Sequence, residues 1–217
     1  MQLLKRIGII GDVHTEQALL ASVLAFLQAV PKLDALLCTG DLVTGPGDAD
    51  RVCDLLQNAN VFTVRGNHDR WFFLPGYDGS MTHTTPHDAL SDRNRAYLAA
   101  LPPTRTFDTP SGSLLLCHGT GTDDMIGIYP NDTEAVLAAN HPLYRIYAER
   151  QVRFLVCGHT HAPMLRTFDH LTIINPGTLR RERRPGFFLA DFTTGTLQAY
   201  RLNPDTGDVL EAEEATL

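Results

Sequence analysis

The feature that most constrains this chain is an apolar run that stops abruptly at polar residues. Ile7-Gly8-Ile9-Ile10 leads directly into Gly11-Asp12-Val13-His14. Successive side chains of an extended backbone alternate sides, so Asp12 and His14 can point the same way from a strand end. A carboxylate beside an imidazole suits a divalent transition metal better than calcium or magnesium. A Gly-Asp turn after a strand is also common without a metal, so this motif alone leaves both interpretations open.

The same transition recurs at four further positions along the chain. Apolar segments also lead into Gly40-Asp41, Gly66-Asn67-His68-Asp69, His118-Gly119 and Gly158-His159-Thr160-His161. A single histidine is usually structural, but five strand ends that all finish in metal-competent residues are hard to explain by packing. The donors also exceed the about three protein ligands of a single catalytic metal. The pattern therefore indicates two metals that share a bridging carboxylate.

The first third of the chain alternates expected strands with expected helices. We expect strands over 3–10, 34–38 and 61–64, and helices over 15–30 and 48–58. Thr15 is the predicted N-cap of the first helix. This alternation predicts a parallel sheet, and ligands collect at the carboxyl ends of the strands in such sheets.

The remainder of the chain predicts further short elements. We expect strands over 114–117 and 153–157, with a helical region over 132–149 that is interrupted at His141-Pro142. The segments 164–168, 171–174, 187–192 and 196–202 predict a mostly antiparallel second sheet, with residues 211–217 frayed. We treat residues 1–217 as a single domain.

The regular pattern breaks between about residues 70 and 103. Aromatic residues 71–73 precede Pro75 and Gly76, and Ser91 is the predicted N-cap of a short helix. We predict a cap insertion beside the site, and an ordinary connection with its own apolar cluster is an equal alternative. His83 and His87 also lie here, and Pro86 argues against a helix that presents both, which favours surface or packing roles.

Composition limits the classes of function. A chain of 217 residues with 43% hydrophobic residues can bury the core of one domain. The formal net charge of −7 argues against a stable nucleic-acid complex. The sequence has no apolar run near the about 18 residues that a membrane span needs, and no signal peptide. Its four cysteines lack Cys-x-x-Cys spacing, so we expect free thiols in a reducing cytoplasm.

Taken in order from Gly11 to Asp191, the motifs resemble those of the calcineurin-like binuclear metallophosphoesterase superfamily. The segments 174–178 and 187–191 are similar to those of its small bacterial and archaeal phosphodiesterase branch. The resemblance implies an α/β fold, a four-layer α-β-β-α sandwich with two mixed sheets face to face and helices outside. Residues 40–45 lack the Asp-Arg that follows in protein phosphatases of the superfamily, which argues against a phosphoprotein substrate.

The resemblance also implies a role for each site residue. It implies that the first metal is held by Asp12, His14 and His161, and the second by Asn67, His118 and His159. Asp41 bridges the two metals. His68 is not a ligand but faces the leaving group, and Asp69 orients it.

The implied activity is hydrolysis of a small or nucleotide-like phosphodiester by a hydroxide that bridges two divalent metals. Resemblance favours manganese, while iron and zinc also suit nitrogen and oxygen ligands without thiolates. A phosphomonoesterase or a dinucleoside-polyphosphate hydrolase is the alternative enzyme. A non-enzymatic scaffold of the same fold, as in the retromer subunit, is less favoured because every ligand position is filled.

Two charged segments are not explained by the metal motifs. Arg180-Arg181-Glu182-Arg183-Arg184 contains arginines that could grip a second phosphate, although a solvated charged turn is the favoured interpretation. Asp123-Asp124 could line the pocket. The physiological substrate and the oligomeric state do not follow from the sequence.

Overall fold

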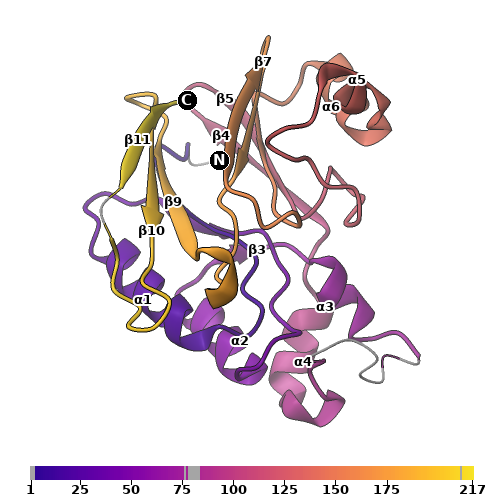
Figure 1. Cartoon of the computed structure of the whole chain (residues 1–217), viewed down its shortest axis with the longest axis vertical. Helices are drawn as coiled ribbons and strands as arrows, with labels where there is room; N and C mark the ends of the chain where they lie inside the picture. The colour runs from indigo at the N-terminus through magenta and orange to yellow at the C-terminus, as the bar shows by residue number, and fades with distance from the viewer. Residues whose placement is uncertain (1–2, 76, 78–83, 211) are drawn as a thin grey trace.

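Two mixed β-sheets pack face to face, with helices on both outer sides (Figure 1). The structure is a computed structural model, and it describes residues 3–75, 77, 84–210 and 212–217. The helices α1 and α2 lie on one outer side, and α5 and α6 lie on the other (Figure 1). The predicted four-layer α-β-β-α sandwich is confirmed.

The first sheet has the strand order β11-β10-β9-β1-β2-β3. Its strands are β1 (Arg6–Ile10), β2 (Ala35–Cys38), β3 (Phe62–Thr63), β9 (Gly186–Asp191), β10 (Thr196–Arg201) and β11 (Glu213–Thr216). The strands β1, β2 and β3 are parallel, as predicted, with Ile9 opposite Leu37. On its other side β1 pairs antiparallel with β9. The carboxyl ends of three parallel strands therefore lie at one edge.

The second sheet has the strand order β4-β5-β6-β8-β7. Its strands are β4 (Thr104–Thr109), β5 (Gly112–Cys117), β6 (Phe154–Val156), β7 (Met164–Phe168) and β8 (Leu171–Asn175). The central strands β5, β6 and β8 are parallel, and antiparallel β4 and β7 flank them.

The C-terminal strands differ from the prediction. They do not form a second sheet of their own, because β7 and β8 join β6 whereas β9, β10 and β11 return to β1. Residues 213–216, which were expected to be frayed, form β11, where Ala215 pairs with Leu197. Five of the six residues of β9 are buried, and a strand buried on both faces needs a central position in a sheet.

Helices cover the outer faces of both sheets. They are α1 (Gln17–Gln28), α2 (Ala49–Asn58), α3 (Asn67–Trp71), α4 (Asp92–Ala99), α5 (Glu134–Ala139) and α6 (His141–Glu149), with 3-10 turns η1 (His87–Ala89) and η2 (Arg181–Arg183). The predicted break at His141-Pro142 is confirmed, because Asn140 ends α5 and caps α6. None of the helices in the described part of the chain combines the length and the hydropathy that a membrane span requires.

Helix caps agree with the sequence in one of the two cases that we predicted. Ser91 accepts a hydrogen bond from Asn94 N and caps α4, as predicted. Thr15 does not cap α1, which begins at Gln17 after Glu16. The backbone of Thr15 is left-handed, with φ 59°, and its hydroxyl accepts from Gly47 N at 2.8 Å. The chain turns sharply after β1, so this hydroxyl joins two loops instead of starting a helix.

The core lies in three apolar layers. One cluster between the sheets contains Ile7, Ile9, Leu37, Leu114, Leu116 and Val156. The opposite faces of β1 and β2 present Ile10, Leu36 and Cys38 to the outer helices. Each large side chain that is fully buried contributes about 1.5–3 kcal/mol, so strands that are buried on both faces hold the site edge firmly.

The segment from residue 70 to 103 is described only in part. His83 lies outside the described residues, and the role of the segment as a cap insertion stays a prediction. Phe72, Leu90 and Leu98 join the core cluster under α2. His87 is exposed, with its ring 4.8 Å from that of Phe72, which agrees with a surface or packing role.

The four cysteines are free and buried, and we expect them to resist thiol reagents in the native protein. Burial raises the pKa of Cys117 to about 12 and raises the pKa of Cys38, Cys53 and Cys157 as well, which suppresses the reactive thiolate. Titration with a chromogenic disulfide should detect all four thiols only after denaturation. Rapid native labelling of Cys38, Cys117 and Cys157 would contradict this core role.

Candidate metal centre

The predicted site residues converge where strand ends of both sheets meet. Asp12 follows β1, Asp41 follows β2 and Asn67 starts α3 after β3. From the second sheet, His118 follows β5, and His159 follows β6. The structure therefore brings together all seven residues that the sequence predicts as metal ligands.

A first group of donors consists of Asp12, His14, Asp41 and His161, whose donor atoms all lie within 4.8 Å of one another. His161 Nε2 is 3.0 Å from His14 Nε2 and 3.2 Å from Asp12 Oδ2. His14 Nε2 is 3.6 Å from Asp41 Oδ2. Two carboxylates and two imidazoles at these separations can surround one cation.

A second group lies beside the first. Asn67 Oδ1 is 2.9 Å from both His118 Nε2 and His159 Nδ1. Asp41 Oδ2 is 3.4 Å from His118 Nε2, and the same oxygen faces His14 in the first group. Asp41 therefore occupies the position between the groups that a bridging ligand requires.

The donor atoms have the chemistry that a metal requires. His14 Nδ1 lies 2.9 Å from Thr44 O, and His118 Nδ1 lies 2.8 Å from Thr39 O. A carbonyl only accepts, so these Nδ1 atoms donate, and in the neutral imidazole each Nε2 then presents a lone pair. Asp12 Oδ2 is buried without a hydrogen-bond partner among the described residues. A cation would satisfy this oxygen together with the facing lone pairs.

The electrostatics of the site also favour a bound cation. Burial lowers the pKa of His14 to about 3, which keeps its imidazole neutral and able to coordinate. Burial alone would raise the pKa of Asp12, but the imidazoles of His118, His161 and His14 outweigh it and bring this pKa to about 2. Burial raises the pKa of Asp41 well above its usual range, and the nearby Asp12 and Asp69 raise it further. A cation between the carboxylates would relieve this repulsion.

Strained backbone turns the donors inward. The φ angles of His14, Asp41, His159 and His161 are 45°, 50°, 65° and 56°. Non-glycine residues rarely adopt this left-handed region, and such strain persists mainly where function requires it. Four of the seven predicted ligands share this feature, which the sequence did not reveal.

Two glycines allow loops to approach the carboxylates closely. A Cβ atom on Gly66 would lie 2.1 Å from Asp41 Oδ1, and one on Gly158 would lie 2.2 Å from Asp12 Oδ1. Any larger residue at these positions would displace the carboxylate of Asp41 or of Asp12. The sequence signal was the glycine immediately before Asn67 and before His159.

His68 lies beside the donor groups rather than within them. Its Nε2 is 3.9 Å from Asp41 Oδ2, and its side chain is 15% exposed. Its ring makes edge contacts with those of His14 and Trp71, with centroid separations of 5.1 and 4.9 Å. Burial lowers the pKa of His68 to about 4, with smaller contributions from His118, His161 and Arg180.

Asp69 makes no hydrogen bond with the imidazole of His68, so its predicted orienting role stays a prediction and can act only indirectly. Its carboxylate accepts from Gly66 N at 2.9 Å and from Leu42 N at 2.8 Å. His68 Nδ1 has no hydrogen-bond partner among the described residues. Asp69 lies three residues after Gly66, which is the spacing of a capping box at a helix start. Its carboxylate therefore accepts hydrogen bonds from backbone N–H groups. It positions His68 only through the start of α3.

Supporting threonines were missed by the sequence reasoning. Thr39 donates its hydroxyl to Asp12 Oδ1 at 2.9 Å, and Thr178 donates to Asp12 O at 2.7 Å. Thr39 directly precedes Gly40-Asp41, and Thr178 ends the 174–178 motif. Their positions beside these motifs were the sequence signal that could have identified the two threonines.

The charged residues around the site are largely paired. Arg70 binds Asp124 through Nε at 2.6 Å and Nη2 at 2.8 Å, joining α3 to the loop after β5. Arg181 binds Glu16, and Arg180 binds Glu182. The Arg70–Asp124 and Arg181–Glu16 pairs attach the two charged segments, Asp123-Asp124 and residues 180–184, to α3 and to the loop after β1.

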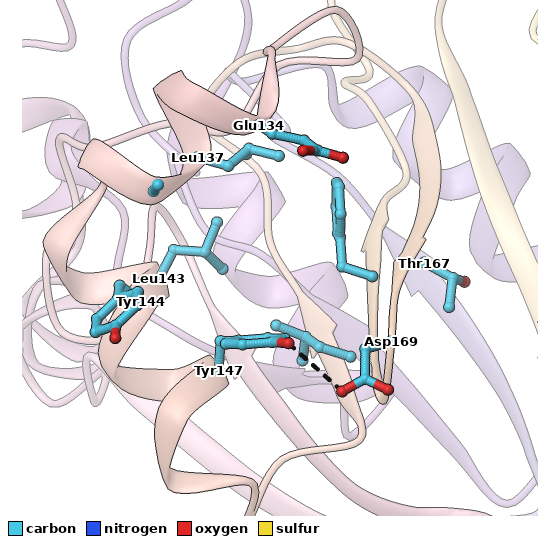
Figure 2. Close-up of a pocket in the computed structure, with 10 residues that line it drawn as sticks. Glu134, Leu137, Leu143, Tyr144, Tyr147, Thr167 and Asp169 are labelled. Atoms are coloured by element: carbon cyan, nitrogen blue, oxygen red, sulfur yellow. Dashed lines mark hydrogen bonds between the residues drawn. The ribbon is translucent and has the colours of Figure 1, made fainter.

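A separate pocket of about 520 Å³ lies between α5–α6 and the β7–β8 hairpin (Figure 2). Leu143, Tyr147 and Phe168 contribute to its lining, and Tyr147 hydrogen-bonds Asp169 at its rim. None of the predicted site residues lines it. It adjoins the start of β8, whereas Asn175 at the end of that strand donates to Gly158 O. This pocket is therefore not the metal centre.

Comparisons with known proteins agree with the geometry. A model described as the calcineurin-like phosphoesterase superfamily domain matches residues 6–195. A probable metallophosphoesterase from Methanothermobacter thermautotrophicus is 26% identical over 173 residues, which cover 79% of this chain and 76% of the relative. The serine/threonine-protein phosphatase 2 of Escherichia coli is 39% identical over 94 residues, which cover 42% of each protein.

A solved structure shows the same fold. The crystal structure of a metallophosphoesterase from Sphaerobacter thermophilus superposes with a TM-score of 0.70 at 22% identity. The match covers 91% of this chain and 88% of that one. At this identity the likeness concerns the fold alone.

Proposed function

The chain belongs to the calcineurin-like phosphoesterase superfamily, and from this premise we propose that it is a phosphodiesterase acting on a small or nucleotide-like diester. Members of this family hydrolyse phosphate esters and depend on metal ions. The observation that carries the proposal is the position of Asp41 Oδ2, 3.6 Å from His14 Nε2 and 3.4 Å from His118 Nε2. One carboxylate oxygen that faces both donor groups supports a binuclear centre.

In the proposed arrangement Asp12, His14 and His161 would hold one ion, and Asn67, His118 and His159 would hold the other. Asp41 would be shared by both. The donors are nitrogen and oxygen atoms without thiolates, which supports manganese and also allows iron or zinc. Divalent cations held there supply Lewis-acid activation of water and of the phosphoryl group. The neutral amide of Asn67 limits the negative charge that opposes an anionic substrate.

His68 has a different task in this proposal. It lies next to Asp41 but outside both donor groups, with its Nε2 directed toward them at 3.9 Å from Asp41 Oδ2. From this position its imidazole can give a proton to the departing oxygen. Asp69 keeps the start of α3 in place through Gly66 N and Leu42 N.

Charge favours a diester over a monoester. Arg70 is held in a two-point pair by the carboxylate of Asp124 and is not free to bind a phosphate. A phosphate monoester carries about −1.5 to −2 charges at neutral pH, whereas a diester carries about one negative charge. A monoester therefore needs more unpaired positive charge in the binding site than a diester does. Residues 40–45 also lack the Asp-Arg of protein phosphatases.

A phosphomonoesterase is the second candidate. The observation that favours it is the 39% identity over 94 residues with serine/threonine-protein phosphatase 2. A dinucleoside-polyphosphate hydrolase would use the same metal centre. The net charge of −7 supports a small-molecule substrate rather than a nucleic acid, and the four buried thiols support a cytoplasmic location.

We expect purified protein with manganese to hydrolyse bis-p-nitrophenyl phosphate faster than p-nitrophenyl phosphate or diadenosine tetraphosphate. The reason is the limited free positive charge around the donor groups. The measurement is kcat/KM for the three substrates, with chelator-treated protein as the control. A preference for the monoester would favour the second candidate. No turnover of any phosphate ester would instead favour a scaffold.

A further inference from the structure

The loop that carries the arginine cluster is attached to the metal centre through Asp12. Leu179 N donates to Asp12 O at 2.8 Å, and Thr178 Oγ1 donates to the same carbonyl at 2.7 Å. Arg180 N in turn donates to Thr178 Oγ1 at 3.1 Å. The position of Arg180 is therefore set relative to a predicted metal ligand by consecutive hydrogen bonds.

Arg181 fixes the direction in which this loop presents its side chains. Its Nε and Nη2 donate to the two carboxylate oxygens of Glu16 at 3.0 and 2.6 Å, and the Glu16 side chain is only 3% exposed. A bidentate arginine–carboxylate pair is geometrically specific. Arg181 is thus a structural anchor of the loop and is not available to a substrate.

Arg180 is held differently from its neighbour. It pairs with Glu182 two residues along the same loop, with Nε 2.6 Å from Oε1. The two side chains are 33% and 51% exposed, so this pair lies at a solvent-accessible rim. Exposed ion pairs contribute little to stability, so a ligand can replace the Glu182 carboxylate at little cost.

Arg180 is the member of the arginine cluster that is tied to the metal centre through backbone. It lies two residues after Thr178, whose hydroxyl bonds both Asp12 O and Arg180 N. By contrast, Arg183 and Arg184 line a groove with Glu213 and Glu214 beside β10 and β11. The cluster of arginines therefore divides into an anchor, a residue near the metal centre and two residues at another surface.

We propose that Arg180 is a substrate-binding residue that exchanges Glu182 for a phosphate oxygen of the ester beside His68. The guanidinium fork suits this exchange, because it presents paired donors in the geometry of a phosphate edge. This role deepens the proposed phosphoesterase function and rests on it for the identity of the ligand as a phosphate. It also explains why an arginine near the site carries a weak, local partner.

The test compares Arg180→Ala and Arg180→Lys with Arg183→Ala in the full, manganese-loaded chain. Arg183→Ala is a matched control, because it removes the same charge from the same loop at a different surface. The readouts are the Kd for inorganic phosphate by calorimetry, the metal content and the Tm. We expect Arg180→Ala to weaken phosphate binding about 10- to 100-fold at unchanged metal content, because a charge-assisted hydrogen bond is lost. The Kd of Arg180→Lys for phosphate should lie between those of wild type and Arg180→Ala, and the Kd of Arg183→Ala should equal that of wild type.

Equal phosphate binding by Arg180→Ala and Arg183→Ala would overturn the proposal, as would a wild-type protein that binds no phosphate. Loss of metal in Arg180→Ala would also overturn the proposal, because Arg180 would then act by supporting the loops that carry the predicted metal ligands. Phosphate binding requires no turnover. A wild-type protein that binds phosphate but hydrolyses no diester would therefore refute the proposed diesterase activity. The effect of Arg180→Ala on phosphate binding would still test the proposed role of Arg180.

Discussion

Asp41→Asn is expected to weaken metal binding at both positions and to abolish hydrolysis. A single oxygen of Asp41 faces His14 of one donor group and His118 of the other, at 3.6 and 3.4 Å. An amide keeps the shape of the side chain, but it removes the negative charge that two cations would share. Asn67→Ala should instead weaken chiefly the second ion, because Asn67 contacts His118 and His159 only within that group.

The measurement is elemental analysis after reconstitution with saturating manganese, where wild type should retain close to two ions per chain. Asp88→Asn makes the same chemical change at an exposed position and serves as the control. The metal-free Asp41→Asn protein should be no less stable than wild type. Burial, Asp12 and Asp69 raise the pKa of Asp41, so its ionised form costs stability at neutral pH. Retention of both ions with near-normal activity would show that Asp41 is not the bridge.

The site was predictable because it depends on local sequence. In β1 and β2 apolar residues face both the inter-sheet core and the outer helices, so each strand is a continuous apolar run. A polar residue at the end of such a run is conspicuous. Parallel connections then bring these ends to one edge of the sheet. His14 and His118 were found in this way although they lie in separate sheets.

The partner of each C-terminal strand could not be predicted in the same way. Apolar alternation shows that residues 187–192 form a strand, but it does not show that the strand pairs with β1 instead of β8. That choice depends on packing of the whole chain. Thr15 was assigned wrongly for a related reason, and the indirect way in which Asp69 acts on His68 was equally hidden. The two side chains accept hydrogen bonds from Gly47 N and Leu42 N in distant loops, and no local spacing reveals those contacts.

His68→Ala is expected to separate catalysis from metal binding. His68 is adjacent to Asn67 in the sequence, but its ring stands outside both donor groups and its Nδ1 has no partner among the described residues. Its removal should therefore leave the metal content unchanged. Loss of a general acid typically reduces the rate about 10²- to 10⁴-fold.

The size of the loss should depend on the leaving group. Nitrophenolate departs readily without a proton, so His68→Ala should affect bis-p-nitrophenyl phosphate least. A ribose alkoxide needs the proton, so a nucleotide-type diester should be affected most. Burial holds the pKa of His68 at about 4, but an anionic phosphate beside the ring would raise this pKa and favour the protonated acid.

The decisive quantity is the ratio of wild-type to mutant kcat/KM on each of the two substrates, with metal content measured in parallel. Trp71→Phe is a useful companion, because it preserves an aromatic ring beside His68 without removing the imidazole. Equal losses on both substrates would mean that a neutral His68 stabilises the transferring phosphoryl group by hydrogen bonding instead of protonating the leaving oxygen. Loss of metal from His68→Ala would make His68 a ligand and would require the donor groups around Asp41 to be reassigned.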